Sequence, residues 1–389
     1  MSLHIKSGFR LVSLAVAALL LGGCQTAAVQ PGVAAADAAA PVATAPMLRQ
    51  DAFKGIYEVA VSADAASVFV ATINGFDKQN AGFIQRLDAR SLQLLQTIQV
   101  PHRSFALGLN RVTNTLYVGN TMEGSLSVVD AASGMVKGVI QLATPVKNDK
   151  GEESMPHTRK VIVDEAHNRV FVTSPGQPGL IWIADGASNT LTHTITSDGI
   201  WTAGAAYDAQ ANRLYVSQGG VNEILVIDPD AGQVIGSLST GDTTDAANTN
   251  DSRHFFINLA IDVQGQRLFS TDASTNQVYV FDIASGRVLN TIPIGIGALD
   301  VVYNAQRNQV ITTHRGVSRS QPNGSGALTF IDATTYEVKR TLDLPVHPNS
   351  LALTPDGATL YVTVKAPHGD KHPAWRKDAL DSVVRIDLR

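Results

Sequence analysis

The stretch LYVGNTMEGSLSVVDAASG, residues 116–134, decides the fold of this chain. A short apolar run, Leu116–Val118, is followed by a polar turn and by a second apolar run that ends at Asp130. Another polar turn, residues 131–134, comes directly after that aspartate. Short runs of β-branched and aromatic residues between clusters of Gly, Asn and Asp indicate β-strands joined by tight turns.

The same unit recurs along the chain. The apolar runs that end in aspartate are Phe83–Asp88, Leu126–Asp130, Leu180–Asp185, Ile224–Asp228, Val278–Asp282, Leu328–Asp332 and Val383–Asp387. Their aspartates are 42, 55, 43, 54, 50 and 55 residues apart, and a partner strand lies about 20 residues or more before each run. A unit of 40–55 residues with four short strands is typical of a propeller blade. The sequence therefore predicts an all-β, seven-bladed β-propeller of four-stranded blades over residues 47–389.

The two ends of the propeller predict how its ring closes. The seventh unit ends at Arg389, directly after its third strand, so its outermost strand is missing. Residues 47–52 precede the first unit and have no other partner in the pattern. Proteins avoid exposed strand edges, so we expect an N-terminal strand at residues 47–52 to complete the seventh blade.

Composition excludes several classes of protein. The chain has 389 residues, 44% hydrophobic, with 30 basic and 34 acidic side chains, so it does not coat nucleic acid by bulk charge. These overall counts do not exclude a local patch of basic side chains. The single cysteine excludes an internal disulfide, a Cys-rich zinc site and an iron–sulfur cluster.

The N-terminus is typical of an export signal. Residues 1–23 carry Lys6 and Arg10 before an apolar run that is too short to span a bilayer permanently. The run ends in Leu21-Gly22-Gly23-Cys24, which resembles a bacterial lipobox, so Cys24 is expected to carry lipid after cleavage. An ordinary signal peptide cut near Ala36 is the alternative. Residues 24–46 are a low-charge tether without a packed core.

That resemblance also implies a location. An aspartate after the lipidated cysteine usually retains a lipoprotein in the inner membrane, and Gln25-Thr26 stand there instead. We therefore expect a periplasmic protein whose lipid on Cys24 anchors it to the outer membrane.

The long loops fall on one face of the predicted ring. Each blade has strands A to D from the channel outward, and the A–B and C–D turns are short. The insertions are residues 73–82, 143–156, 239–253, 315–326 and 366–381, all in B–C or D–A connections. These connections emerge on the same face of a propeller, and long loops on a rigid scaffold often carry binding sites.

Alignment of the A strands predicts which side chains surround the channel on that face. An outer layer reads Gly55, Arg103, His157, Trp201, Phe255, Gly297 and His347. Two residues further along each strand, on the same side, come Tyr57, Phe105, Arg159, Ala203, Ile257, Leu299 and Asn349. The B-strand ends add Asn120, His314, Arg315 and Lys365. A cationic funnel with aromatic side chains suits a single-stranded polyanion whose bases stack, such as single-stranded DNA.

Other interpretations of these residues remain open. The ring of side chains also suits a plug that packs the channel, although unpaired buried arginines are costly. The loop face would equally serve a protein-binding scaffold at the outer membrane. A metal-dependent lyase or lactonase is the third alternative, because His102, His157, His254, His314 and His347 come from five units and three of them would suffice for a metal.

Several observations weigh against the enzyme. The carboxylates at matching positions are few, Glu58, Asp272 and Asp300. His368 and His372 have metal-ligand spacing for a helical turn, but Pro367 and Pro373 favour an irregular loop. There is no phosphate-binding Gly loop and no nucleophile elbow. We therefore expect no catalytic residues, no metal and no cofactor.

The units resemble a known family. Leu116–Thr121 and Leu360–Val364 look like the YVTN repeat, and five stretches are similar to the YncE-like periplasmic propellers. They are residues 54–58, 119–121, 254–258, 313–315 and 347–353, which include Lys54 and Asn258 as further candidate site residues. The resemblance covers about residues 47–389 and implies a seven-bladed periplasmic protein that binds single-stranded DNA without established catalysis. The lipobox and residues 366–372 depart from that pattern.

Overall fold

The computed structural model describes residues 47–75, 77, 80–147, 151–197, 199, 201–242, 253–318 and 320–389. The expected signal peptide, Cys24 and the tether lie outside the described residues. The described part of the chain contains β-strands and no helix, so no helix in it is long and apolar enough to cross a membrane.

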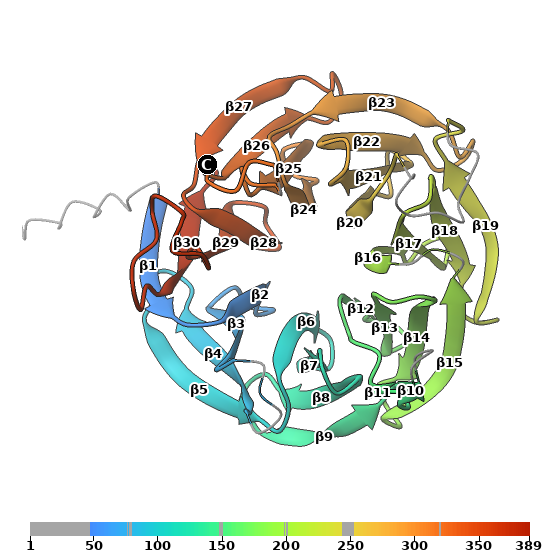
Figure 1. Cartoon of the computed structure of the whole chain (residues 1–389). Helices are drawn as coiled ribbons and strands as arrows, with labels where there is room; N and C mark the ends of the chain where they lie inside the picture. The colour runs from blue at the N-terminus through green and yellow to red at the C-terminus, as the bar shows by residue number, and fades with distance from the viewer. Residues whose placement is uncertain are drawn as a thin grey trace, which may run out of the picture. The chain divides into compact units, whose positions relative to one another are not determined.

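Seven antiparallel four-stranded sheets follow one another around a central channel (Figure 1). Blade 1 contains β2 (Ile56–Val61), β3 (Ser67–Ile73), β4 (Gly82–Asp88) and β5 (Leu94–Val100), and blade 2 contains β6 (Ser104–Asn110), β7 (Thr115–Asn120), β8 (Ser125–Asp130) and β9 (Val136–Gln141). Blade 3 contains β12 (Val161–Asp164), β13 (Arg169–Ser174), β14 (Gly179–Asp185) and β15 (Thr190–Ser197), and blade 4 contains β16 (Trp201–Asp208), β17 (Arg213–Gly219), β18 (Glu223–Asp228) and β19 (Gln233–Ser239). Blade 5 contains β20 (Phe256–Asp262), β21 (Arg267–Asp272), β22 (Gln277–Asp282) and β23 (Val288–Pro293), and blade 6 contains β24 (Ala298–Asn304), β25 (Gln309–His314), β26 (Ala327–Asp332) and β27 (Val338–Asp343). The predicted seven-bladed propeller is confirmed.

The seventh blade is assembled from both ends of the propeller. Its strands, from the channel outward, are β28 (His347–Leu353), β29 (Thr359–Lys365), β30 (Asp381–Asp387) and β1 (Met47–Phe53). β1 pairs antiparallel with β30, with Gln50 opposite Val383, as Figure 1 shows at the junction of the two ends. The predicted ring closure is therefore confirmed.

The repeated aspartates close the turns between the third and fourth strands. In blade 2 the Asp130 carboxylate accepts hydrogen bonds from the backbone N–H of Ser133 (2.9 Å) and from its hydroxyl group (2.9 Å). Asp88, Asp185, Asp228, Asp282 and Asp332 accept backbone N–H groups in the same way. An aspartate can hold a tight turn by bonding to the backbone two or three residues on, which explains its place in every unit.

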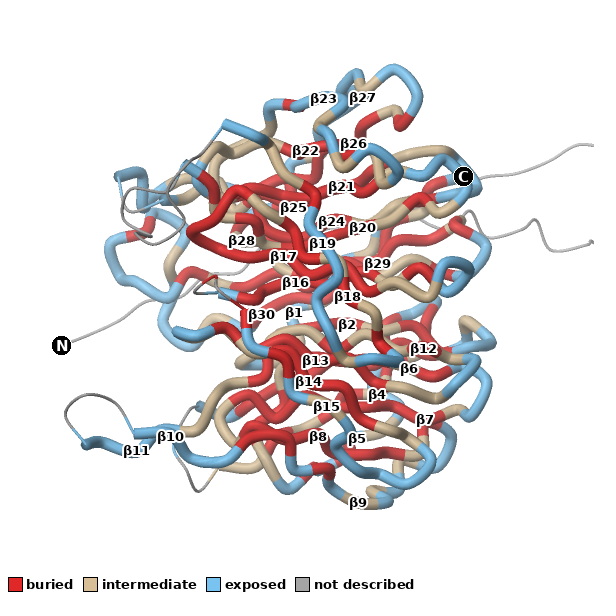
Figure 2. The backbone as a smooth tube through the Cα atoms, turned by 90° about the vertical axis from the view of Figure 1, so that its right-hand side faces the viewer, coloured by how far each residue is buried: buried red, intermediate tan, exposed pale blue. Residues whose placement is uncertain are grey.

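The core lies between neighbouring blades. Buried apolar side chains form seven clusters, and each cluster joins residues of two adjacent sheets. One of them contains Val59 and Leu87 of blade 1 together with Tyr361 and Val383 of blade 7. Hydrophobic burial therefore also stabilises the contact between the first and the last blade. Figure 2 shows the burial along the sheets. It also shows the hairpin of β10 (Val146–Lys147) and β11 (Glu153–Ser154), part of the insertion at 143–156, as exposed chain beyond the blades.

Candidate functional site

A recurring irregularity of the innermost strands shapes the channel. The pairing of strands A and B shifts register near the start of strand A in six blades, for example between Phe256 and Leu259 and between Ala298 and Val301. The freed backbone N–H of Asp300 donates to the Thr313 hydroxyl at 2.9 Å. Such a bulge adds a residue to one strand and re-aims its side chains, so strict alternation fails there.

The bulges bring consecutive residues to the channel. The neighbouring residues 57 and 58, 257 and 258, 299 and 300, and 349 and 350 line the same cavity. A serine or threonine of strand B accepts the bulge N–H in four of these blades, at Ser217, Thr271, Thr313 and Thr363. In blade 3, whose A–B pairing has no such shift, Thr173 accepts the backbone N–H of Lys160. This repeated hydroxyl is the sequence signal that would have predicted the extra channel residues.

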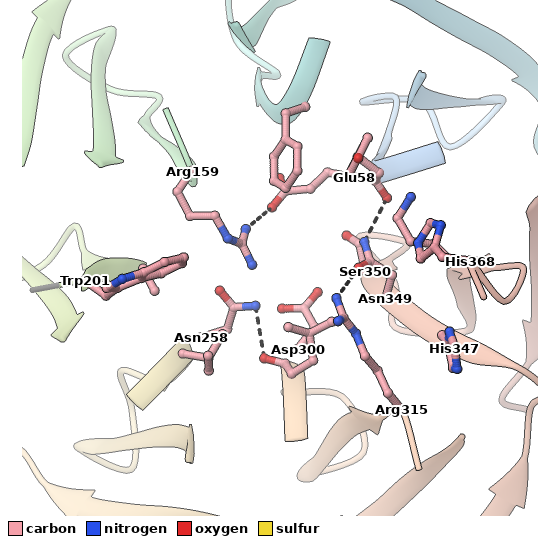
Figure 3. A pocket seen from close by; sticks show the side chains of 16 residues that line it. Glu58, Arg159, Trp201, Asn258, Asp300, Arg315, His347, Asn349, Ser350 and His368 are labelled. Atoms are coloured by element: carbon pink, nitrogen blue, oxygen red, sulfur yellow. Dashed lines mark hydrogen bonds and ion pairs between the residues drawn. The ribbon is translucent and has the colours of Figure 1, made fainter. Parts of the chain in front are cut away.

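A cavity of about 350 Å³ opens at the start of the innermost strands; we call it the mouth cavity. Its lining comes from all seven blades and includes every residue of the deeper layer predicted above. The residues are Tyr57, Glu58, Phe105, Arg159, Trp201, Ala203, Ile257, Asn258, Leu299, Asp300, Arg315, His347, Asn349, Ser350, Lys365 and His368. Figure 3 shows Arg159, Asn258, Asp300 and Arg315 pointing toward its centre. The cavity lies on the face that carries the long insertions.

Buried charges form the floor of the mouth cavity. Glu58, which is 4% exposed, accepts hydrogen bonds from Lys160 (Nζ–Oε1, 3.1 Å) and from Arg159 (Nη1–Oε1, 3.4 Å). The other oxygen of Glu58 accepts the backbone N–H of Leu107 at 3.1 Å. Asp300 accepts the backbone N–H of Leu351 at 2.8 Å. Burial raises the pKa of Asp300 although Lys160 opposes the shift. Burial would lower the pKa of Lys160, but Glu58 and Asp300 outweigh it and raise that pKa.

Cations and aromatic rings alternate along one wall. Lys365 Nζ lies 3.8 Å from the centre of the Tyr57 ring, and the Arg159 guanidinium lies 5.4 Å from the centre of the Phe105 ring. The Tyr57 and Phe105 rings lie 4.2 Å apart. Such contacts stabilise a cation where water is partly excluded. Elsewhere on the rim Trp201 is 43% exposed and packs against Phe255, with ring centres 5.8 Å apart.

Arg315 has no compensating acid in the part of the chain that the structure describes. It makes no ion pair with any described residue, and its strongest polar contact in the cavity is from Nη2 to Asn349 Oδ1 at 3.4 Å. Its Nε is buried and has no hydrogen-bond partner among the described residues. Burial and the nearby positive charge of Arg159 both lower the pKa of Arg315. A buried, unpaired guanidinium is costly, so this position favours an anion.

Two more basic side chains near Arg315 have lowered pKa values. Burial lowers the pKa of Lys365 to about 8, although Asp381, 3.8 Å away, opposes the shift. Burial and the positive charge of Arg315 lower the pKa of His347 to about 4, so its imidazole is neutral at pH 7. The Nε2 atom of His347 is buried without a partner among the described residues. The site therefore also offers a neutral imidazole nitrogen.

Eight predicted site residues come together in the mouth cavity, and six do not; Lys54, one of the six, lies at a neighbouring cavity. Tyr57, Arg159, Trp201, Asn258, Arg315, His347, Asn349 and Lys365 line the mouth cavity. Arg103, Asn120, His157, Phe255 and His314 do not line it. Sequence reasoning did not propose Lys160 or Ser350 for the channel, it placed Phe105 only in the deeper layer, and it named Glu58, Asp300 and His368 only as possible enzyme or metal groups.

The outlying residues have local partners. Arg103 is 4% exposed and pairs with Glu123, from Nε to Oε1 at 2.6 Å, so its guanidinium already has an acidic partner. His157 lies within reach of the charges of that pair, and burial lowers its pKa. Asn120 is fully buried and bonds to Ser125 at 2.9 Å. Its amide therefore supports the turn of blade 2 and does not face the channel.

The histidines do not converge on a metal position. The described residues include no group of three or more His, Cys, Asp or Glu side chains placed to hold one. His254 is enclosed by Asp272 (Nδ1–Oδ2, 2.7 Å) and Asp242 (Nε2–Oδ1, 2.9 Å) in blade 5. His314 is buried, with its Nδ1 3.5 Å from the Thr329 hydroxyl.

His368 and His372 also have different surroundings. His368 lines the mouth cavity, whereas His372 Nε2 bonds to the carbonyl oxygen of Gly324 at 2.9 Å. The loop between them is not helical. The irregular loop that Pro367 and Pro373 favoured over a helical turn is therefore confirmed.

A second cavity of about 400 Å³ adjoins the first over the junction of blades 7 and 1; we call it the seam groove. It shares Tyr57, Lys365 and His368 with the mouth cavity. Its other lining residues are Lys54, Gly55, Ile73, Asn74, Gly75, Ala366, Pro367, Ala379 and Asp381. Lys54, the remaining predicted site residue, pairs there with Asp378 at 3.1 Å in an exposed position.

Comparison with known proteins identifies the family. The chain is 33% identical over 370 residues to the uncharacterized protein YncE of Salmonella typhi, which covers 95% of this chain and 96% of that protein. It belongs to the YncE family. YncE of Escherichia coli K12 is 32% identical over 342 residues, which covers 88% of this chain and 91% of that protein. No protein-family model matches the chain.

Proposed function

We propose that this protein is a binding module of the bacterial envelope that takes anionic groups of single-stranded DNA, or of another polyanion, into the mouth cavity. Arg315 is the observation that carries the proposal, because its buried guanidinium has no acidic partner among the described residues. A phosphate or carboxylate group of a ligand would supply the missing charge and hydrogen bonds.

Aromatic side chains at the same cavity support a ligand with flat faces. Trp201 keeps 43% of its surface exposed beside Phe255, and Tyr57 and Phe105 line the cavity. Bases of a single strand stack on such rings, whereas a duplex hides its base faces. Cations together with stacking surfaces therefore favour a single strand over a duplex.

The carboxylates favour binding without catalysis. Both oxygens of Glu58 are occupied by Lys160, Arg159 and a backbone N–H, and Asp300 accepts backbone N–H groups. A general base needs an oxygen that can reach a substrate proton. These groups instead hold the floor of the cavity in place, so we infer that the protein is not an enzyme.

We also propose that Cys24 carries lipid and tethers the propeller to the outer membrane from the periplasmic side. The support is the sequence Leu21-Gly22-Gly23-Cys24 after the apolar run, with Gln25 next to it.

Fluorescence anisotropy of a labelled single-stranded oligonucleotide tests the binding function. We expect saturable binding that an unlabelled single strand displaces and that the corresponding duplex displaces poorly. Absence of binding, or equal displacement by the duplex, would contradict the proposal.

A further inference from the structure

A buried ion pair stands between the mouth cavity and the other end of the channel. A separate cavity of about 350 Å³ opens from the opposite end and is lined by later residues of the innermost strands, such as Ile162, Tyr207 and Tyr303. The two cavities share Asp300, and Lys160 lines the far one while Glu58 lines the near one. The Glu58–Lys160 ion pair therefore lies between them. A polymer strand that ran from one cavity to the other would have to pass this buried pair and Asp300.

The mouth cavity is also small. Ligand pockets span about 300–1,000 Å³, and this cavity of about 350 Å³ is near the lower limit. It has room for one unit of a polymer and not for a strand that enters and turns back.

The charges around the mouth cavity favour an anion. The described residues there include four cations, Arg159, Lys160, Arg315 and Lys365, against three carboxylates, Glu58, Asp300 and Asp381. At least one positive charge is in excess, and Arg315 carries it.

The units of a ligand that do not fit the mouth cavity can lie in the adjoining seam groove. It meets the mouth cavity at Tyr57, Lys365 and His368 and continues over the blade 7–blade 1 junction. Lys54 stands at the groove with 54% of its side chain exposed, and its partner Asp378 is 70% exposed. Water screens such a surface pair, so Lys54 can exchange Asp378 for a ligand anion at little cost.

We propose that the site binds the end of a single-stranded anionic chain, with the terminal unit in the mouth cavity beside Arg315 and the next units in the seam groove beside Lys54. This inference rests on the proposed function and adds to it that a free end is required. Internal segments would have to enter and leave the small mouth cavity at once.

Competition between linear and circular strands tests the requirement for an end. A labelled linear oligonucleotide is bound first, and it is then displaced by the unlabelled linear strand or by the same strand ligated into a circle. We expect the circle to compete at least about tenfold more weakly. Equal competition would overturn end binding and leave the proposed function standing. No binding of the labelled linear strand would contradict the proposed function itself.

A groove-filling variant tests the exit path. Ala379 lines the seam groove, and Leu380 beside it is 40% exposed and does not line it. We expect Ala379→Trp to weaken the binding of a linear strand by about tenfold and to leave the affinity for a single nucleotide unchanged. The matched control Leu380→Trp should leave both unchanged. Unaltered strand affinity in Ala379→Trp, or an equal loss for the single nucleotide, would overturn the assignment of the groove.

Discussion

Glu58 and Lys160 are 102 residues apart in the sequence, yet their side chains form a buried ion pair (Oε1–Nζ, 3.1 Å) that closes the middle of the channel. The side chains are 5% and 17% exposed. Each charge is tolerated because the other lies against it, together with Arg159 and Asp300.

Removal of one partner should therefore be costly. We expect Glu58→Gln to lower the free energy of unfolding by about 3–5 kcal/mol, because it leaves Lys160 buried without its nearest acid. Urea denaturation monitored by circular dichroism measures this. Glu337→Gln is the control, since Glu337 pairs with Lys339 on the surface at 67% exposure and should matter little. Similar losses in the two variants would mean that the buried pair has no special role.

The closing strand should stabilise the whole ring. Leu48 and Phe53 of β1 pack against the cluster between blades 1 and 7, and Ser382 donates a hydrogen bond to Asp51 at 2.6 Å. Deletion of residues 25–45 should leave the melting temperature unchanged. Deletion through Ala52 should lower it sharply, because burial of a large apolar side chain contributes up to about 1.5–3 kcal/mol and an edge of β30 is exposed. Equal melting temperatures for the two truncations would refute the closure.

Much of this fold could be predicted from the sequence. Alternating strands and turn aspartates recur in every unit, and side-chain alternation placed Tyr57 and Asn349 correctly at the channel. These features are local, because strand pairing and tight turns depend on residues near one another. The missing outer strand of the seventh unit likewise predicted the role of residues 47–52.

Other parts of the site could not be predicted by the same reasoning. The bulges turn Glu58 and Asp300 toward the channel although they follow a channel-facing residue directly, and strict alternation excludes that. Arg103 was predicted to surround the channel, but it pairs with Glu123 in the B–C turn of its blade and does not line the mouth cavity. Pairing of this kind depends on side-chain direction in three dimensions, which spacing alone does not give.

Anion binding should weaken in alkaline solution. The pKa of Lys365 is about 8, so its ammonium group loses its proton as the pH rises through that value. A bound anion favours the charged form, so affinity should fall between about pH 7 and pH 9. Lys365→Arg keeps the charge and should abolish this decline in an oligonucleotide titration. A decline of the same size in Lys365→Arg would show that another group is responsible.

Stacking on Trp201 should contribute independently of salt. We expect Trp201→Ala to weaken single-strand binding by about 1–3 kcal/mol for a stacked base, at low and high salt alike. Trp201→Phe keeps an aromatic face and should retain most of the affinity. Because Trp201 is 43% exposed, the melting temperature should change little. If Trp201→Ala had a lowered melting temperature and unchanged single-strand affinity, Trp201 would have only a packing role.

The anchor can be tested by cell fractionation. We expect Cys24→Ser to move the protein from the outer-membrane fraction to the soluble periplasm, because the proposed lipid would attach through that thiol. Mass spectrometry of the mature wild-type protein should find a lipid-modified N-terminal cysteine. Mature chains that begin after residue 30 would contradict the anchor.

The salt dependence of single-strand binding to the wild type, Arg315→Ala and Arg287→Ala tests the central claim most directly. Arg287 is exposed in a turn on the opposite face, so its replacement removes the same charge away from the mouth cavity. We predict that Arg315→Ala binds more weakly and that its slope of log affinity against log salt is shallower by about 0.7, which corresponds to one phosphate contact on a single strand. Arg287→Ala should match the wild type. If Arg315→Ala also matches the wild type in affinity and slope, the mouth cavity is not the anion-binding site.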